Sequence, residues 1–135
     1  MQDMITIQRQ LPLGPMQAWD WLTDSARTAL WYGPFRLEGD RLFVRLMHEE
    51  GQPEAEGRLL SMIPGRELRL QLGWEVTLTL DEIPGGSLIR LRQAKTGTAD
   101  DPWIEAGWSF YLDCLLAAIR GDKAPDFKDY HPKEG

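Results

Sequence analysis

The sequence offers few side chains whose type and spacing could carry catalysis or metal binding. It holds two histidines, His48 and His131, which lie far apart, and one cysteine, Cys114, which stands among leucines. A metal site needs several such ligands at workable spacing, and a reactive thiolate needs a basic neighbour. No phosphate-binding loop, nucleophile elbow or dinucleotide-binding glycine motif occurs. We therefore expect no metal, no cofactor and no assignable catalytic residue, which leans against an enzyme.

Tryptophan is the most informative residue type in the chain. Six tryptophans occur in 135 residues, at positions Trp19, Trp21, Trp31, Trp74, Trp103 and Trp108. Aromatic side chains can fill a core with large apolar area. The same side chains line small-molecule pockets, which are mostly apolar with a few placed polar groups. Both roles stay open on composition alone.

Three polar residues share predicted strand faces with apolar neighbours. Gln93 has the parity of Leu91, and Ser61 and Arg9 lie in the same way among apolar residues of other strands. Burying such groups costs several kcal/mol unless they are hydrogen-bonded. They either reach the rim of the sheet and bond to backbone there, or line a wet cavity and orient a ligand.

The elements that must position these residues follow from periodicity and turn chemistry. Alternation of apolar and polar residues predicts a strand over 4–11. A short helix is expected over 16–22, and Asp24 or Ser25 can cap a second one that runs to about residue 30. Apolar residues at helical spacing predict a long helix over 102–120, which a glycine ends.

Between residues 35 and 95 the pattern is strand and turn, with turn signals at Pro64-Gly65 and at 84–86. We expect three linked hairpins that share one apolar face and leave the other face in solvent. The predicted pairs are Ser61 with Leu68, Leu59 with Leu70, Leu72 with Val76, Leu70 with Leu78, Leu80 with Ile89, Leu78 with Leu91 and Val76 with Gln93.

These elements predict an α+β fold in the order β-α-α-β-α. A curved antiparallel sheet wraps around the long C-terminal helix, and two short helices follow the first strand. The chain has the length of one domain. We expect that domain over residues 1–121, with a polar, frayed tail over 122–135.

Composition and charge exclude several classes of partner. Fifteen basic and 21 acidic residues give a net charge of −6, which argues against nucleic acid and anionic membrane. No apolar run approaches the roughly 20 residues of a membrane span, and the first residues do not resemble a secretory signal. A single cysteine fits a reducing compartment, so we expect a cytoplasmic protein.

Four segments, in order, resemble one superfamily. They are Leu11–Trp19, Trp31–Phe35, Pro84–Leu91 and Gly107–Leu115. They are similar to the START/Bet v 1-like (SRPBCC) superfamily and, within it, to the branch named after the activator of the heat-shock-protein-90 ATPase. The resemblance implies the helix-grip fold and a cavity between the sheet and the long helix. Gln93 stands where that branch commonly has a histidine, so chemistry that needs a histidine does not carry over.

The sequence and the resemblance together predict a protein that binds a hydrophobic or amphipathic small molecule in that cavity, with Gln93 and the polar atoms of Trp and Tyr orienting it. The expected lining residues are Trp31, Tyr32, Phe35, Trp74, Leu78, Leu91, Gln93, Trp108, Tyr111 and Leu112. One alternative is a cofactor-free polyketide cyclase or hydrolase that uses Tyr111, Arg9 or Glu105. Another is a co-chaperone-like interaction module that uses the arginine-bearing outer face of the sheet, and a protein partner or a homodimer stays open.

Overall fold

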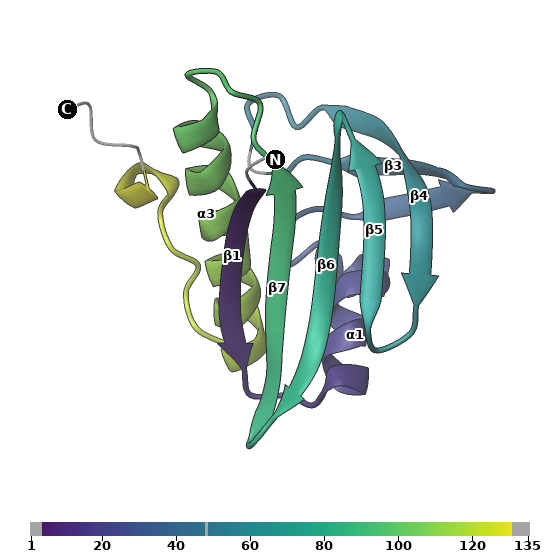
Figure 1. Ribbon diagram of the computed structural model, residues 1–135, viewed down its shortest axis with the longest axis vertical. Helices are drawn as coiled ribbons and strands as arrows, with labels where there is room; N and C mark the ends of the chain where they lie inside the picture. Colours follow the sequence, from purple (N-terminus) through teal and green to yellow (C-terminus); the bar gives the residue numbers. More distant parts are fainter. Residues whose placement is uncertain (1–3, 48, 131–135) are drawn as a thin grey trace.

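The computed structural model describes residues 4–47 and 49–130, and these form one seven-stranded antiparallel sheet with helices on one side (Figure 1). The strand order is β1-β7-β6-β5-β4-β3-β2. The strands are β1 (Met4–Leu11), β2 (Phe35–Glu38), β3 (Arg41–Arg45), β4 (Glu54–Ile63), β5 (Glu67–Leu72), β6 (Trp74–Ile83) and β7 (Gly86–Ala94).

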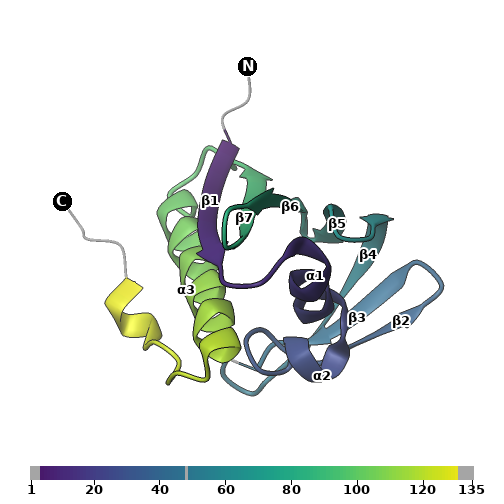
Figure 2. The ribbon, with the colours of Figure 1, turned by 90° about the horizontal axis from the view of Figure 1, so that it is seen from below.

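The helices are α1 (Pro15–Thr23), α2 (Ser25–Thr28), α3 (Asp101–Arg120) and the short 3-10 helix η1 (Phe127–Tyr130). The helices α1, α2 and α3 lie inside the curve of the sheet, and the C-terminal helical turn η1 lies on the far side of α3 (Figure 2). The Asp24 carboxylate accepts a hydrogen bond from the Ala26 amide (3.0 Å) and so caps α2. Gly121, with φ of +75°, ends α3 in the left-handed conformation that glycine adopts without strain. This is the predicted helix-grip α+β fold.

The inner face of the sheet and α3 share one apolar core. Ile89 and Leu91 of β7 are fully buried, as are Leu112 and Leu115 of α3. Figures 1 and 2 show α3 against the β1 and β7 side of the sheet. Burial of this kind is the main favourable contribution to folding, and it fixes α3 on one half of the sheet only.

Several predicted elements are confirmed. β1 has the predicted bounds, and α1, α2 and α3 begin and end within two residues of the predicted helices. The register between β6 and β7 is also as predicted, with Leu80 opposite Ile89 and Val76 opposite Gln93. The turn at Pro84-Gly85 joins the two strands with no shift in register. Gly85 has a φ of +84°, a conformation that such turns need and that glycine adopts readily.

The predicted register between β4 and β5 is wrong near the turn. Leu59 pairs with Leu70 as expected, but the register shifts between Leu59 and Ser61, so Ser61 pairs with Arg69 and Met62 takes the place opposite Leu68. A bulge of this kind inserts one extra residue into one strand. It moves Met62 to the inner face, and Ser61 is therefore not an inner-face polar group.

The predicted register between β5 and β6 is also wrong, by two residues. Leu72 pairs with Trp74 and Leu70 pairs with Val76, because the chain reverses at Gly73 alone. Gly73 has a φ of +77°, a conformation that glycine adopts readily. A shift of two residues preserves the side on which each residue lies, so the predicted apolar face survives.

The segment after α3 is more ordered than the predicted frayed tail. Phe127 and Tyr130 are partly buried against the core cluster, and the Tyr130 hydroxyl donates to a carboxylate oxygen of Asp113 at 2.6 Å. Aromatic side chains that close the end of a core account for this order. Residues 131–135 lie outside the described residues, as do both histidines, and the domain division at residue 121 stays a prediction.

No helix in the described part of the chain has both the length and the apolar character that crossing a membrane would require.

Candidate functional site

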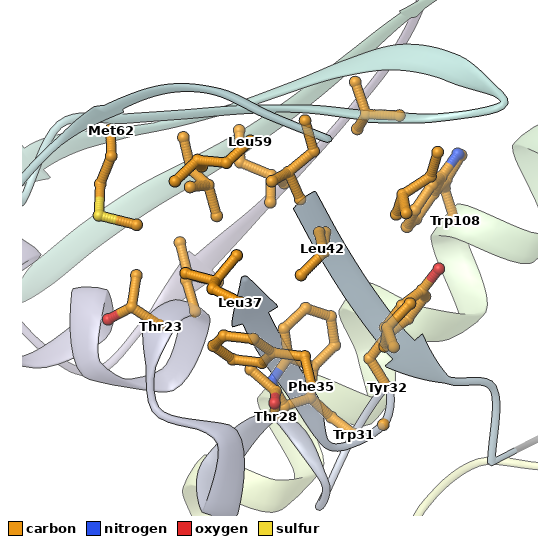
Figure 3. Close-up of a pocket in the computed structure, with 18 residues that line it drawn as sticks. Thr23, Thr28, Trp31, Tyr32, Phe35, Leu37, Leu42, Leu59, Met62 and Trp108 are labelled. Carbon is orange, nitrogen blue, oxygen red and sulfur yellow. The ribbon is translucent and has the colours of Figure 1, made fainter. Parts of the chain in front are cut away.

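A cavity of about 100 Å³ lies between strands β2 to β6 and the helices α1 and α2 (Figure 3). We call it the inner pocket. Its lining residues are Leu22, Thr23, Thr28, Trp31, Tyr32, Gly33, Phe35, Leu37, Leu42, Val44, Leu59, Met62, Leu68, Leu70, Leu72, Val76, Leu78 and Trp108. The long helix contributes Trp108 alone. Strands supply most of the lining, and on the side away from the sheet the pocket is closed by α1, α2 and residues 31–33, whereas we expected it under the long helix.

The inner pocket carries no charged side chain, since its eighteen lining residues include no acid, lysine, arginine or histidine. Its two threonines direct their hydroxyls away from the cavity. Thr23 donates to the carbonyl oxygen of Trp19 (2.9 Å), and Thr28 donates to that of Ser25 (3.1 Å). A hydroxyl already bonded within its helix does not need a ligand to satisfy it.

Both tryptophans of the inner pocket also donate their N–H groups to the protein. Trp31 Nε1 donates to the carbonyl oxygen of Trp21 (2.9 Å), and Trp108 Nε1 donates to Gln93 Oε1 (2.8 Å). Gln93 is fully buried, and its Nε2 has no acceptor among the described residues. Gln93 therefore fixes the Trp108 indole, and each tryptophan presents apolar ring surface to the cavity.

Among the residues that line the inner pocket, Tyr32 has a hydroxyl that forms no hydrogen bond with another described residue. Its ring stacks on Trp108 (centroids 5.9 Å apart, 12° between planes) and meets Tyr111 edge-on at 4.5 Å. Burial, followed by the nearby Tyr111 and Glu49, raises the pKa of Tyr32 well above its ordinary value of 10.0. The phenol therefore stays protonated and acts as a hydrogen-bond donor.

A second depression, of about 400 Å³, lies on the other side of the Tyr32 and Trp108 rings. We call it the outer pocket. It is lined by Tyr32, Leu46, Glu49, Ala55, Glu56, Leu72, Gly73, Trp74, Ile104, Gly107, Trp108 and Tyr111. Tyr32, Leu72 and Trp108 line both pockets, so these three side chains form the wall between them.

The structure divides the ten predicted site residues into three groups. Five line the inner pocket: Trp31, Tyr32, Phe35, Leu78 and Trp108. Trp74 and Tyr111 line the outer pocket, together with Tyr32 and Trp108. Leu91, Gln93 and Leu112 line neither pocket and are fully buried. Leu91 and Gln93 lie on β7 and Leu112 lies on α3, in the half of the fold where the long helix packs against the sheet.

Sequence reasoning missed most of the aliphatic wall of the inner pocket. Leu42 and Val44 alternate with Arg41, Phe43 and Arg45, a pattern that marks an inner strand face. The sequence therefore contains a pattern from which Leu42 and Val44 could have been predicted to face inward. Met62 had no comparable signal, because only the bulge in β4 turns it inward.

The residues considered for cyclase or hydrolase chemistry do not meet at the inner pocket. The Arg9 guanidinium donates to Asp113 (Nε to Oδ1, 2.7 Å), and Glu105 is exposed on α3. Burial raises the pKa of Tyr111 to about 12 and that of the Cys114 thiol to about 11. In the described part of the chain, no group of three histidine, cysteine or acidic side chains is placed to hold a metal ion.

Fold and site together define a helix-grip protein with an apolar cavity under the sheet. Solved structures share this fold. The protein SSP2350 from Staphylococcus saprophyticus is 15% identical with a TM-score of 0.78, over 90% of this chain and 95% of that one. CalU16 from Micromonospora echinospora is 26% identical with a TM-score of 0.73, over 93% and 79%.

DynU16, a putative protein in the dynemicin biosynthetic locus, is 18% identical with a TM-score of 0.76, over 92% of this chain and 49% of that one. No protein-family model and no curated protein matches the sequence. The shared architecture is consistent with the START/Bet v 1-like superfamily. The narrower likeness to the heat-shock-protein-90 activator branch stays a prediction.

Proposed function

We propose that this protein binds a small molecule whose uncharged, largely apolar part occupies the inner pocket. The observation that carries the proposal is a preformed cavity whose lining has no charged group and whose N–H and O–H groups, apart from the Tyr32 hydroxyl, are bonded within the protein. Such a lining gains free energy when apolar ligand surface leaves water. It gives nothing to a charged group, which would lose its hydration without a partner.

The size of the inner pocket limits the part of the ligand that it can hold. Its volume of about 100 Å³ compares with the roughly 150 Å³ of an apolar cavity that takes up benzene. A single ring, or a short branched chain, is the group of matching size. Leu37 and Met62 line the pocket and are also 41% and 42% exposed. We expect a ligand to enter beside these two side chains. In Figure 3, Met62 lies on the same side of the pocket as Thr23.

Binding is better supported than the two alternatives. A cofactor-free cyclase or hydrolase needs a proton carrier with a suitable pKa at the cavity, and Tyr32, the titratable lining residue, has a raised pKa. DynU16 is described as a putative protein of a biosynthetic locus, and a ligand of biosynthetic origin would suit the inner pocket. The interaction-module and homodimer alternatives remain predictions.

A titration with 4-phenylbutanol tests the proposal. The six indole N–H signals in a two-dimensional NMR spectrum report on separate places in the fold. We expect the signals of Trp31 and Trp108 to shift in a saturable way, since both rings line the inner pocket. Trp103, which lines neither pocket, should change little. Absence of any saturable shift up to the solubility limit would contradict the proposal.

A cavity-filling substitution provides the matched variant. Leu59→Trp places a larger side chain in the inner pocket, whereas Leu60→Trp makes the same change at an exposed neighbour on β4. We expect Leu59→Trp to weaken 4-phenylbutanol binding at least about tenfold, because the ring no longer fits. Leu60→Trp should bind like the native protein. Equal binding by all three proteins would place the probe elsewhere.

A further inference from the structure

The outer pocket combines aromatic rings with carboxylates. Four of its lining residues are aromatic, two are glutamates, and none is basic. Trp74 stands at its edge with 48% of its surface exposed, and the edge-on pair of Tyr32 and Tyr111 lies deeper. Aromatic faces attract a cation through the ring quadrupole. The two carboxylates add attraction for a cation and disfavour an anion.

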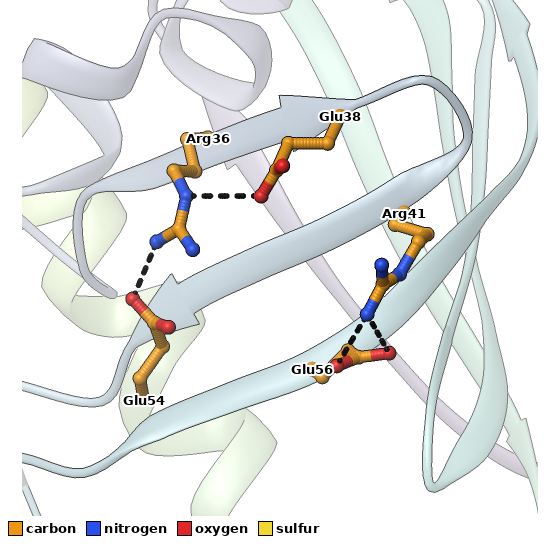
Figure 4. Close-up of polar contacts among 5 residues, drawn as sticks. All are labelled: Arg36, Glu38, Arg41, Glu54 and Glu56. Carbon is orange, nitrogen blue, oxygen red and sulfur yellow. Dashed lines mark hydrogen bonds and ion pairs between the residues drawn. The ribbon is translucent and has the colours of Figure 1, made fainter.

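The two glutamates differ in whether their charge is already neutralised. Arg41 donates to both carboxylate oxygens of Glu56 at 3.1 Å (Figure 4). Glu54, next along β4 on the same side, accepts from Arg36 at 2.7 Å. For Glu49, which is exposed, the described residues provide no ion-pair partner. Glu49 is therefore the uncompensated negative charge at the outer pocket.

The charge of Glu49 reaches the aromatic groups of the outer pocket. Burial is the main cause of the raised pKa of both Tyr32 and Tyr111, and the carboxylate of Glu49 raises the pKa of each further. The same carboxylate would attract a positively charged group near these two rings. The negative charge of Glu49 and the aromatic ring faces therefore both favour a positively charged ligand group.

We propose that the outer pocket binds an ammonium group, which belongs to the ligand whose apolar part occupies the inner pocket. This inference rests on the proposed function and narrows it to amine-bearing amphipathic molecules. The two pockets share Tyr32, Leu72 and Trp108 as lining residues and therefore adjoin. The inference requires the linker of one ligand to pass between these side chains. Tyr32 then contacts both of its parts.

Three probes of one shape test the inference. 4-Phenylbutylammonium, 4-phenylbutanol and 4-phenylbutyrate carry the same ring and linker with charges of +1, 0 and −1. We expect the ammonium to bind about fivefold more tightly than the alcohol at low salt, and the carboxylate to bind most weakly. The indole signal of Trp74 should shift with the ammonium and not with the alcohol. Added salt should reduce the preference for the cation.

Two variants that each remove one negative charge test whether Glu49 is the source of the preference for the ammonium probe. Glu49→Gln should lower ammonium affinity to that of the alcohol and leave alcohol binding unchanged. Glu50→Gln removes the same charge from an exposed neighbour that lines neither pocket, and it should preserve the preference. A preference that persists in Glu49→Gln, or that Glu50→Gln abolishes equally, overturns the inference.

The outcomes separate the two proposals. If the alcohol shifts Trp31 and Trp108 while the ammonium binds no better than the alcohol, the ammonium site is overturned and the inner pocket stands. If no probe shifts any indole signal, the proposed function itself is overturned, and the ammonium site with it. If the ammonium shifts Trp74 alone, the outer pocket binds cations independently, and the single-ligand form of the inference is wrong.

Discussion

At the scale of single residues, Tyr32 decides how a ligand would be oriented. It lines both pockets, whereas the other side-chain donors of the inner pocket are bonded within the protein. The tryptophan N–H groups, which we expected to orient the ligand, are held by the carbonyl of Trp21 and by Gln93. A protonated phenol in an otherwise apolar cavity favours a ligand that presents one acceptor beside its ring.

Replacing Tyr32 by phenylalanine tests this role. We expect Tyr32→Phe to weaken 4-phenylbutanol about fivefold, which corresponds to one hydrogen bond of about 1 kcal/mol. Butylbenzene, which has no acceptor, should bind both proteins alike. Tyr130→Phe serves as the control, because Tyr130 lines neither pocket. NMR titration or calorimetry gives the affinities, and an equal loss for both probes would show that Tyr32 acts through packing alone.

The sequence predicted which residues are inward-facing better than it predicted which line a cavity. Strand parity correctly placed Gln93 and Leu91 on the buried side. Parity says nothing about what covers a residue, and both lie on β7, where α3 closes directly over the sheet. Leu42 and Val44 have the same inward parity on β3, yet they line the pocket. The difference depends on the path of the helices, which no local pattern records.

At the scale of elements, the turns explain where the predicted registers hold and where they fail. The Pro84-Gly85 turn has a sequence signature that fixes its pairing, and β6 and β7 match the prediction. A bulge between Leu59 and Ser61 leaves no such signature, and the reversal at Gly73 is shorter than the loop that we expected. The three predicted hairpins are therefore present, with the predicted apolar face wrong beyond Leu59 in β4 and the register wrong at two of them.

A polar cluster joins the first strand, the long helix and the segment after it. Asp113 of α3 accepts from Arg9 of β1 at 2.7 Å and from Tyr130 of η1 at 2.6 Å. Burial by itself would raise the pKa of Asp113, but the two hydrogen bonds and the positive charge of Arg9 outweigh it and hold the pKa below 3.8. Arg9, a candidate for the cavity in the sequence, thus has a structural role on this side of the fold.

This cluster predicts a pH-dependent contribution to stability. Asp113→Asn should lower the free energy of unfolding by about 1–2 kcal/mol at pH 7. Because the pKa of Asp113 is lower in the folded state than in the unfolded chain, its contribution is complete above about pH 4 and is lost as the pH falls through the folded value. The difference between native protein and variant should therefore be constant above about pH 4 and shrink as the pH falls below that value.

Urea unfolding at a series of pH values measures this difference. Asp122→Asn, at an exposed position just beyond α3, provides the control and should match the native protein at every pH. A constant gap between the native protein and Asp113→Asn across the acid range would contradict the role of the charged cluster.

At the scale of the whole molecule, one half of the sheet packs against the long helix and the other half lines the inner pocket. The half formed by β1 and β7 packs against α3 and contributes fully buried residues such as Ile89 and Leu91 to the core. The half from β2 to β6 curves away over α1 and α2 and leaves the inner pocket. The long helix covers one half of the concave face, and the two short helices cover the half in which the cavity lies.

The central claim is that the inner pocket receives the apolar part of a small molecule. A crystal structure of the protein soaked with 4-phenylbutanol tests it most directly. The account predicts density for the phenyl ring among Leu42, Leu70 and Val76, with the hydroxyl of the probe near that of Tyr32. A structure in which those side chains meet one another across a closed interior, or in which the ring lies only on the outside of the sheet, would contradict the account.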